Sequence, residues 1–272
     1  MKSAKKTPLL ILALLAVIGV TALTALHGQT QKSSSAAHQD NLKRAQEDFY
    51  TVTDYEAAEP TEARKRALRR VRAERHNMRV QKGVDPRRFM LTEDRESSFA
   101  TPPFDVPLGS PLPATTSDAV VVGEVSNAEA FLTEDKTAII SEFTVQLSEV
   151  LKDNPTVPLV SGTSIDVNRS GGAVRFASGK VIRQGMFGSP LPRVGRKYVF
   201  FLKYDSEGQD FKIVTAYELN AGRIAPLDGI SIDGNPSNRY PDYQKYRGWD
   251  EGTFLNEVRQ AVINISVGGR AK

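Results

Sequence analysis

Cysteine is absent from this chain of 272 residues. Disulfides, thiolate nucleophiles and cysteine-ligated zinc or iron–sulfur sites are therefore excluded. Any folded domain in the chain must owe its stability to its hydrophobic core, and a segment of about 150 residues is long enough to build one.

Histidine is almost as scarce. The three histidines are His27, His38 and His76, and residues 77–272 contain none. This excludes a Ser-His-Asp triad, a histidine-ligated zinc site and a histidine general base from that part of the chain. We therefore expect it to have no catalytic residue, no metal site and no cofactor.

Carboxylates are the remaining candidates for acid–base chemistry, so a carboxylate-dependent hydrolase stays open as an alternative. The acidic residues in predicted strands are Glu124, Glu142, Glu149, Asp166 and Glu218. The alternation of polar and apolar residues around Glu142 predicts that this side chain faces solvent. Surface charge is the simpler interpretation of the whole set.

Positive charge is concentrated near the N-terminus. Residues 1–80 contain 14 Lys and Arg against 8 Asp and Glu, whereas residues 118–272 contain 18 against 19. The C-terminal part is therefore close to neutral, although the net charge of the whole chain is +4. This distribution argues against a nucleic-acid-binding surface in that part.

A long hydrophobic segment lies at the N-terminus. Lys2, Lys5 and Lys6 precede an uncharged apolar run over residues 8–26. As a helix the run would span about 28 Å, close to the thickness of a bilayer core. It is longer than a secretory h-region, and no clear small-x-small cleavage site ends it. We expect residues 1–28 to be an uncleaved signal anchor in the cytoplasmic membrane, with the rest of the chain outside; a cleaved leader on a secreted protein is the alternative.

A polar tether and a basic helical stalk are predicted over residues 29–80. A first helical pattern carries an apolar stripe from Leu42 to Val52, and a second helix is predicted over residues 60–79. The basic residues of the second helix are Arg64, Lys65, Arg66, Arg69, Arg70, Arg72, Arg75 and Arg79.

Three interpretations of this basic helix remain open. It is a solvated stalk, it is attracted to anionic lipid headgroups or acidic envelope polymers, or it docks onto an acidic protein of the envelope. Nucleic acid is not an expected partner, because export removes it and no aromatic or Gly-rich recognition pattern accompanies the charge.

A proline-rich stretch, residues 81–117, is predicted to be an extended linker. Beyond it the apolar pattern predicts a β domain with a small hairpin around residues 173–183. Its principal strands are predicted over residues 119–125, 138–151, 164–168, 197–204 and 211–219. A bulge is expected near Val150, and Gly123 permits a bulge or a tight bend.

The centre of this domain is predicted at Val194–Tyr204. Tyr198–Leu202 is a run of five apolar residues, rich in aromatic and β-branched types, which indicates a strand covered on both faces. A turn joins it to the next strand, in which alternate residues are expected to point to one face. Those residues are Phe211, Ile213, Thr215, Tyr217 and Leu219.

The predicted fold is mainly β. The strands suit a small, five-stranded Greek-key barrel of the OB type over residues 118–228, because a closed barrel leaves no exposed edge. A β-sandwich is the alternative. Residues 229–272 are predicted to supply an aromatic loop and a C-terminal amphipathic helix that packs on the barrel, with Asp250 as its N-cap.

Several scaffold motifs resemble a family of exported, membrane-anchored bacterial proteins of uncharacterised function. The motifs are D-A-V-V-V-G-E-V (118–125), E-F-T-V-Q-L-S-E-V-L-K (142–152), G-G (171–172), P-R-V-G-R-K-Y-V-F-F-L-K (192–203) and Y-E-L-N-A-G-R-I (217–224). The barrel is also similar, more distantly, to netrin-type modules and tissue inhibitors of metalloproteases. Those inhibitors act through an N-terminal cysteine, which this chain lacks, so neither resemblance implies a functional residue.

Two sets of side chains are candidates for ligand binding. The first is an aromatic series at three-residue spacing in an irregular segment, where binding surfaces are common; packing of the terminal helix is the alternative. The second set lies on predicted hairpins and could form a basic rim for an anionic ligand, with scattered surface charge as the alternative. The residues are Tyr240, Tyr243, Tyr246 and Trp249 in the first set and Arg169, Arg175 and Arg183 in the second.

These observations predict a membrane-tethered, extracytoplasmic binding module that is not an enzyme. A structural protein of envelope assembly, docking through its basic helix, is one alternative. A carboxylate-dependent hydrolase is the other.

Overall fold

The computed structural model describes residues 52–57, 59–80, 90–93, 99–100, 109–185, 190–230 and 241–268, which all belong to one compact unit, Asp48–Lys272. The predicted signal anchor and most of the tether lie outside the described residues. Among the helices that are described, none is both long enough and apolar enough to cross a membrane.

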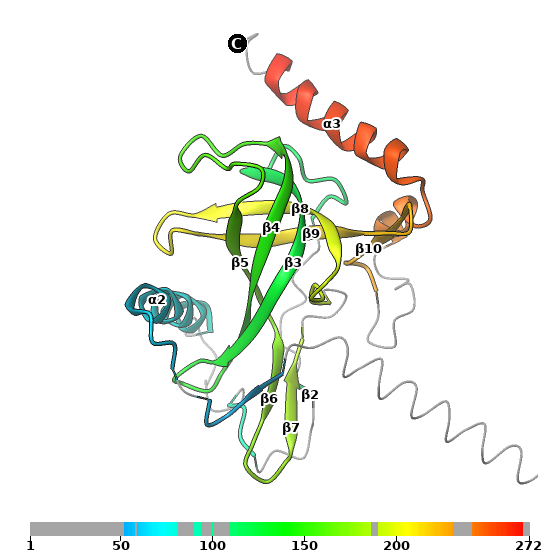
Figure 1. The fold of residues 1–272 in the computed structure, drawn as a ribbon. Coiled ribbons are helices and arrows are strands. Elements are labelled where there is room, and N and C mark those ends of the chain that lie inside the picture. Colours follow the sequence, from blue (N-terminus) through cyan, green and yellow to red (C-terminus); the bar gives the residue numbers. More distant parts are fainter. Residues whose placement is uncertain are drawn as a thin grey trace, which may run out of the picture. The chain divides into compact units, whose positions relative to one another are not determined.

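The described part of the chain is mainly β, as predicted (Figure 1). In chain order its elements are β1 (Val52–Asp54), α2 (Ala63–Val80), β2 (Phe99–Ala100), β3 (Ala119–Leu132), β4 (Ile139–Lys152), β5 (Ser164–Ser170), β6 (Gly172–Arg175), β7 (Val181–Gln184), β8 (Lys197–Asp205), β9 (Asp210–Asn220), β10 (Arg223–Pro226), the 3-10 helix η2 (Pro241–Tyr246) and α3 (Glu251–Gly268).

The five principal strands pair in a closed cycle. β3 pairs antiparallel with β4 and with β8, β4 pairs antiparallel with β5, and β8 pairs antiparallel with β9. Two parallel pairs, Val167↔Phe211 and Asn168↔Lys212, join β5 to β9. These are the five strands that the sequence predicts. β3 is longer than expected, because its pairing with β4 continues as far as Leu132.

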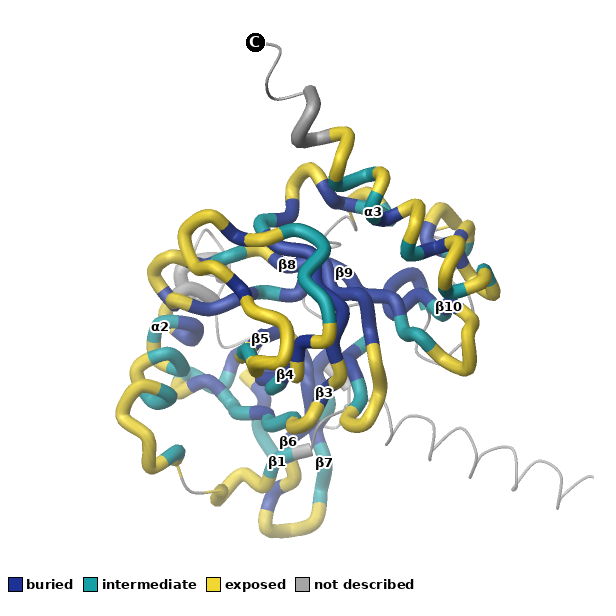
Figure 2. Tube along the Cα trace, turned by 45° about the horizontal axis from the view of Figure 1, so that its top comes forward, coloured by how far each residue is buried: buried dark blue, intermediate teal, exposed yellow. Residues whose placement is uncertain are grey.

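The central strand β8 is buried on both faces, as predicted, and Figure 2 shows the tube as buried through β8 and β9. Its apolar side chains alternate between two core clusters. Tyr198, Phe200 and Leu202 belong to the first, and Val199 and Phe201 belong to the second, which also contains residues of α3. The strand therefore contributes side chains to both clusters, one on each of its faces.

The neighbouring strand β9 does not keep one face throughout, so that prediction is wrong. Phe211 and Ile213 lie in the first cluster, whereas Tyr217 and Leu219 pack with the second. The register between β8 and β9 shifts at Val214, which has no partner in the ladder of paired residues. A bulge of this kind adds one residue to a strand and reverses the alternation of faces beyond it.

The bulges expected in β3 and β4 are confirmed. The register shifts between Val122 and Gly123, and it shifts again at Leu151, which has no partner in β3. A Cβ atom at Gly123 would lie 2.5 Å from Cγ1 of Val145 and 2.8 Å from the carbonyl oxygen of Gln146. Glycine is therefore required here, because the two strands approach too closely for any side chain.

A second sheet has the order β1-β6-β7-β2, and its outer strands come from the predicted tether and linker. Val52 starts β1, which pairs in parallel with β6 at Ala173. The prediction of a helical pattern up to Val52 is therefore wrong at this residue, which lies in a strand. Leu91 is buried against Ile182 in a third core cluster. Within the predicted linker, residues 81–117, β2 and Leu91 are therefore held by tertiary contacts that the local pattern does not show.

The C-terminal helix α3 starts as predicted. Oδ1 of Asp250 accepts a hydrogen bond of 3.0 Å from the backbone N–H of Thr253, which is the geometry of an N-cap. Phe254 and Val258 of α3 are fully buried in the second core cluster. The first half of the helix therefore packs on the outer side of the sheet, where the ring of Phe254 contacts Tyr217 of β9.

Candidate functional site

Helix α2 packs on the sheet through a stripe of basic side chains. Lys65, Arg69 and Arg72 are four and three residues apart, which places them on one face of a helix. In the first turn of α2, Nη1 of Arg66 donates hydrogen bonds to two carbonyl oxygens that precede the helix, those of Pro60 at 2.7 Å and of Thr61 at 2.6 Å. These bonds hold the approaching chain against the first turn of α2.

Arg72 lies at the centre of this contact. Its guanidinium bonds one oxygen of Glu142 on β4, and its Nε donates to Oδ2 of Asp210 on β9 at 2.7 Å. The side chains of Arg72, Glu142 and Asp210 are 3%, 8% and 2% exposed. Asn168 of β5 donates a further hydrogen bond of 2.6 Å to Oδ2 of Asp210. One arginine therefore joins two strands that are distant in the sequence.

Arg69 and Lys65 extend the contact toward solvent. Arg69 donates to Oε2 of Glu142 at 2.7 and 3.0 Å and to Oε2 of Glu129 at 2.9 Å, and its guanidinium lies 4.8 Å from the ring centre of Phe131. Lys65 lies 2.8 Å from the same oxygen of Glu129. The hydrogen bond from Lys65 lowers the pKa of Glu129 despite the partial burial of that carboxylate.

The prediction that Glu142 faces solvent is wrong. Alternation along β4 does place Glu142 on the other face of the strand from Phe143 and Val145, which belong to the first core cluster. The outer face of β4 is covered at this point by α2, so Glu142 is buried beneath Arg69 and Arg72. The basic residues of the predicted stalk are therefore partly used inside the protein.

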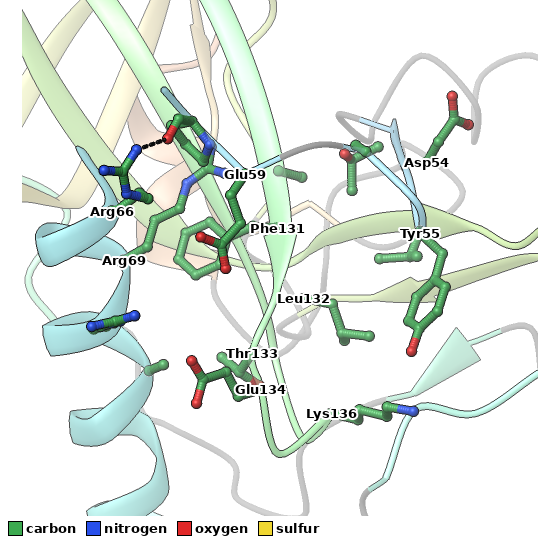
Figure 3. Close-up of a pocket in the computed structure, with 17 residues that line it drawn as sticks. Asp54, Tyr55, Glu59, Arg66, Arg69, Phe131, Leu132, Thr133, Glu134 and Lys136 are labelled. Carbon is green, nitrogen blue, oxygen red and sulfur yellow. Dashed lines mark hydrogen bonds between the residues drawn. The ribbon is translucent and has the colours of Figure 1, made fainter. Parts of the chain in front are cut away.

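A pocket of about 370 Å³ lies beside this contact, between α2, the chain around β1 and the far end of the β3–β4 hairpin (Figure 3). Its floor is apolar and is formed by Ala73, Ala130, Phe131, Leu132 and Val174. Tyr55 closes one side; its ring stacks on Phe176 with 5.0 Å between ring centres.

Charged side chains surround the apolar floor. The basic ones are Arg66, Arg69, Arg70 and Lys136, and the acidic ones are Asp54, Glu59 and Glu134. Nζ of Lys136 lies 5.5 Å from the centre of the Tyr55 ring. The pocket thus combines an apolar surface with both signs of charge, which suits recognition of a small polar molecule more than of a purely apolar one.

The aromatic series proposed for ligand binding is used mainly in packing. Tyr243 and Tyr246 are 3% exposed, and Trp249 is half-buried. The ring of Tyr246 lies 5.1 Å from Trp249 and 5.8 Å from Tyr217, centre to centre. Tyr240 lies outside the described residues. The described members of the series therefore attach η2 and α3 to the sheet.

The three arginines proposed as a basic rim lie in different surroundings. Arg169 on β5 is buried in an ion pair with Asp228. Arg175 at the end of β6 is exposed and lies 3.3 Å from Asp54, and Arg183 is half-buried in β7. Only the neighbourhood of Arg175 adjoins the α2 pocket, through Asp54.

The basic side chains of α2 differ in their exposure to solvent. Lys65, Arg69 and Arg72 pair with carboxylates of the sheet, whereas Arg64 and Arg70 are exposed. The structure does not describe the side chains of Arg75 and Arg79. The positive surface offered to a lipid or an acidic partner is thus smaller than the sequence suggests.

Sequence reasoning missed several residues of this site, notably Tyr55, Glu129, Phe131 and Asp210. Each is an ordinary surface or strand residue in its own segment, and no local pattern connects it to α2. The one available signal was the spacing of Lys65, Arg69 and Arg72. This spacing could not be interpreted until the structure showed its acidic partners on the sheet.

No protein-family model matches this chain, and a search of curated proteins found no relative. In the part of the chain that the structure describes, no group of three or more histidine and acidic side chains could hold a metal ion.

Proposed function

We propose that this chain is an exported, membrane-tethered binding module without catalytic activity, and that the α2 pocket is its ligand site. The observation that carries the proposal is the pocket itself, with a volume of about 370 Å³ and an apolar floor surrounded by charged groups. Sites for small molecules are usually concave, measure about 300–1,000 Å³, and combine an apolar lining with a few polar groups.

The scaffold that we propose for this site is a small Greek-key barrel of the OB type. The closed cycle of pairings among β3, β4, β5, β9 and β8 supports it, since such a cycle leaves each of these strands with two neighbours. We assign residues 118–228 to the barrel and residues 229–272 to the loop and helix that pack on it. α2 is added to this unit, because its arginines bond β4 and β9.

Attachment to the membrane is proposed from the N-terminal sequence. Three lysines followed by an uncharged apolar run favour a signal anchor over residues 1–28, with the folded domain outside the cytoplasm. Docking of the domain through its basic helix is the weaker alternative, since Lys65, Arg69 and Arg72 already have acidic partners within the chain.

The absence of catalysis is proposed from the chemistry of the residues near the pocket. Residues 77–272 contain neither histidine nor cysteine, so an acid–base role there would fall to carboxylates. The carboxylates that line the pocket, those of Asp54, Glu59 and Glu134, are all exposed. The buried carboxylates of Glu142 and Asp210 are both bonded by Arg72, and neither lines the pocket.

Replacing Ala57 with tryptophan is expected to weaken ligand binding strongly without unfolding the protein. Ala57 is exposed and lines the pocket, so an indole there would occupy the space above the apolar floor. Compounds from a library of amino acids, peptides, sugars, nucleotides and organic acids are tested for thermal stabilisation of the detergent-solubilised full chain. We expect affinities for binding compounds to fall by about tenfold or more in Ala57→Trp, since affinity depends on a few well-packed central contacts.

Ala67→Trp is the matched control, because Ala67 is exposed on α2 and does not line the pocket. Binding that survives in Ala57→Trp would place the ligand elsewhere. Conversion of any bound compound into a product by the full chain would contradict the proposal of a non-enzymatic module.

The proposed topology can be tested with single cysteines, because the natural chain has none. Ser161 lies exposed between β4 and β5, and Ser3 precedes the apolar run. We expect a membrane-impermeant maleimide to label Ser161→Cys in intact spheroplasts and to label Ser3→Cys only after lysis. The opposite pattern would contradict export, and release of labelled Ser161→Cys into the medium would indicate a cleaved leader.

A further inference from the structure

We infer that the α2 pocket takes a small zwitterion with an apolar body, which is the chemistry of a free amino acid or a short peptide with unblocked ends. This inference rests on the proposed function, because it names the ligand class of the same site. The charged groups of the pocket fall into two sets, those that already have a partner within the chain and those that remain available to a ligand.

Four of the charged groups already have a partner within the chain. Arg69 bonds Glu129 and Glu142, and Arg66 bonds backbone carbonyl oxygens at the start of α2. Asp54 lies 3.3 Å from Arg175, and Nζ of Lys136 lies 5.5 Å from the centre of the Tyr55 ring. These groups shape the walls of the pocket, but a ligand would have to compete with their present partners.

The available groups are of both signs. Arg70, Glu59 and Glu134 are exposed and line the pocket, and their side chains have no hydrogen bond or ion pair with any residue that the structure describes. In Figure 3 the side chain of Glu59 extends toward Phe131, and that of Glu134 extends from the β3–β4 hairpin toward α2. A cation on α2 and two anions on the facing segments therefore remain without partners around one apolar floor.

A ligand of a single charge does not match this arrangement. An anion that approached Arg70 would be repelled by Glu59 and Glu134, and a cation drawn to these carboxylates would be repelled by Arg70. A zwitterion satisfies both sets, with its carboxylate on the guanidinium of Arg70 and its ammonium on the glutamates. Charge-assisted hydrogen bonds of this kind are stronger than neutral ones, and arginine recognises carboxylates in a bidentate geometry.

The remaining surface of the pocket fits the side chain of such a ligand. Ala130, Leu132 and Val174 offer apolar contact below the charged groups. The volume lies near the lower end of the range for small-molecule sites, which limits the ligand to a few residues.

The test uses the dipeptide Ala-Leu in four forms, titrated by calorimetry into the full chain in detergent. The forms are the free dipeptide, the N-acetylated dipeptide, the C-terminal amide and the doubly blocked dipeptide. We expect the free dipeptide to bind most tightly and each block to weaken binding by about tenfold, since a hydrogen bond to a charged group is lost.

Two variants assign the ends of the ligand. Arg70→Gln should weaken the free dipeptide by about tenfold and leave the C-terminal amide unaffected, whereas Glu134→Gln should weaken only forms with a free ammonium. Arg64→Gln and Glu74→Gln are the controls, because both residues are exposed on α2 and neither lines the pocket. Neither control should change the binding of any form.

The inference is overturned if a singly blocked dipeptide binds as tightly as the free one, since the pocket would then select one charge only. It is also overturned if none of the four forms binds. In that case the proposed function survives when another compound loses its binding in Ala57→Trp, and it fails as well when no compound does.

Discussion

Arg72→Met is expected to lower the free energy of unfolding by about 3 kcal/mol or more, because it leaves Glu142 and Asp210 in the interior without their shared cation. Removing one partner of a buried ion pair typically lowers the free energy of unfolding by about 3–5 kcal/mol, because the remaining charge is left buried without a partner. Methionine keeps the apolar length of the arginine stem, so the loss reflects the charge more than the packing.

Two features place the expected cost near the lower end of that range. Arg69 still donates to Glu142, and Asn168 still donates to Asp210. In addition, α2 is joined to the sheet largely through these charges, so it can separate locally and admit water to both carboxylates. Urea unfolding should therefore be combined with hydrogen exchange of the α2 amides, which should lose protection before the strands do.

Arg64→Met is the matched control, since Arg64 is exposed on the same helix and its replacement should change stability by less than about 0.5 kcal/mol. A triple variant with Arg72→Met, Glu142→Gln and Asp210→Asn should recover part of the loss, because no buried charge is left unpaired. If Arg72→Met is no more destabilising than Arg64→Met, the ion-pair network does not hold α2 in place.

Phe254→Ala should cost about 3–5 kcal/mol, the usual range for deleting a buried aromatic side chain. Phe254 is fully buried, and its ring centre lies 4.8 Å from Tyr217 and 5.3 Å from Tyr246. The truncation would leave a cavity where α3, η2 and β9 meet. Urea unfolding followed by the fluorescence of Trp249, the one tryptophan in the chain, reports on this region directly.

Ile263→Ala is the control for Phe254→Ala, because Ile263 lies on the same helix and is 50% exposed. Its replacement should cost well under 1 kcal/mol. Equal effects of the two substitutions would mean that α3 is not part of the cooperative core. The aromatic series around Tyr243 and Tyr246 would then return as a candidate binding surface.

The sheet was the most predictable part of the fold. Runs such as Tyr198–Leu202 are apolar on successive residues, and this pattern reports burial on both faces without reference to the rest of the chain. Glycine at position 123 and a capping aspartate at position 250 are likewise local signals, because backbone geometry and one side-chain hydrogen bond account for each.

The candidate site was much less predictable. Glu142 has the same polar–apolar surroundings as a solvent-exposed strand residue, and only the position of α2 makes it buried. The spacing of Lys65, Arg69 and Arg72 could equally describe a solvated stalk. Val214 shows the same limit within a strand, because a bulge depends on the register of its neighbour β8.

The sequence by itself determined that residues 77–272 lack cysteine and histidine, and where the five principal strands and the start of the C-terminal helix lie, because residue types and short-range periodicity carry that information. The tertiary structure alone decided that a basic helix would cover two acidic strand residues and leave a pocket beside them. The physical reason is that ion pairs and pocket walls form between segments far apart in the chain, and the partners are chosen by folding, not by spacing along the sequence.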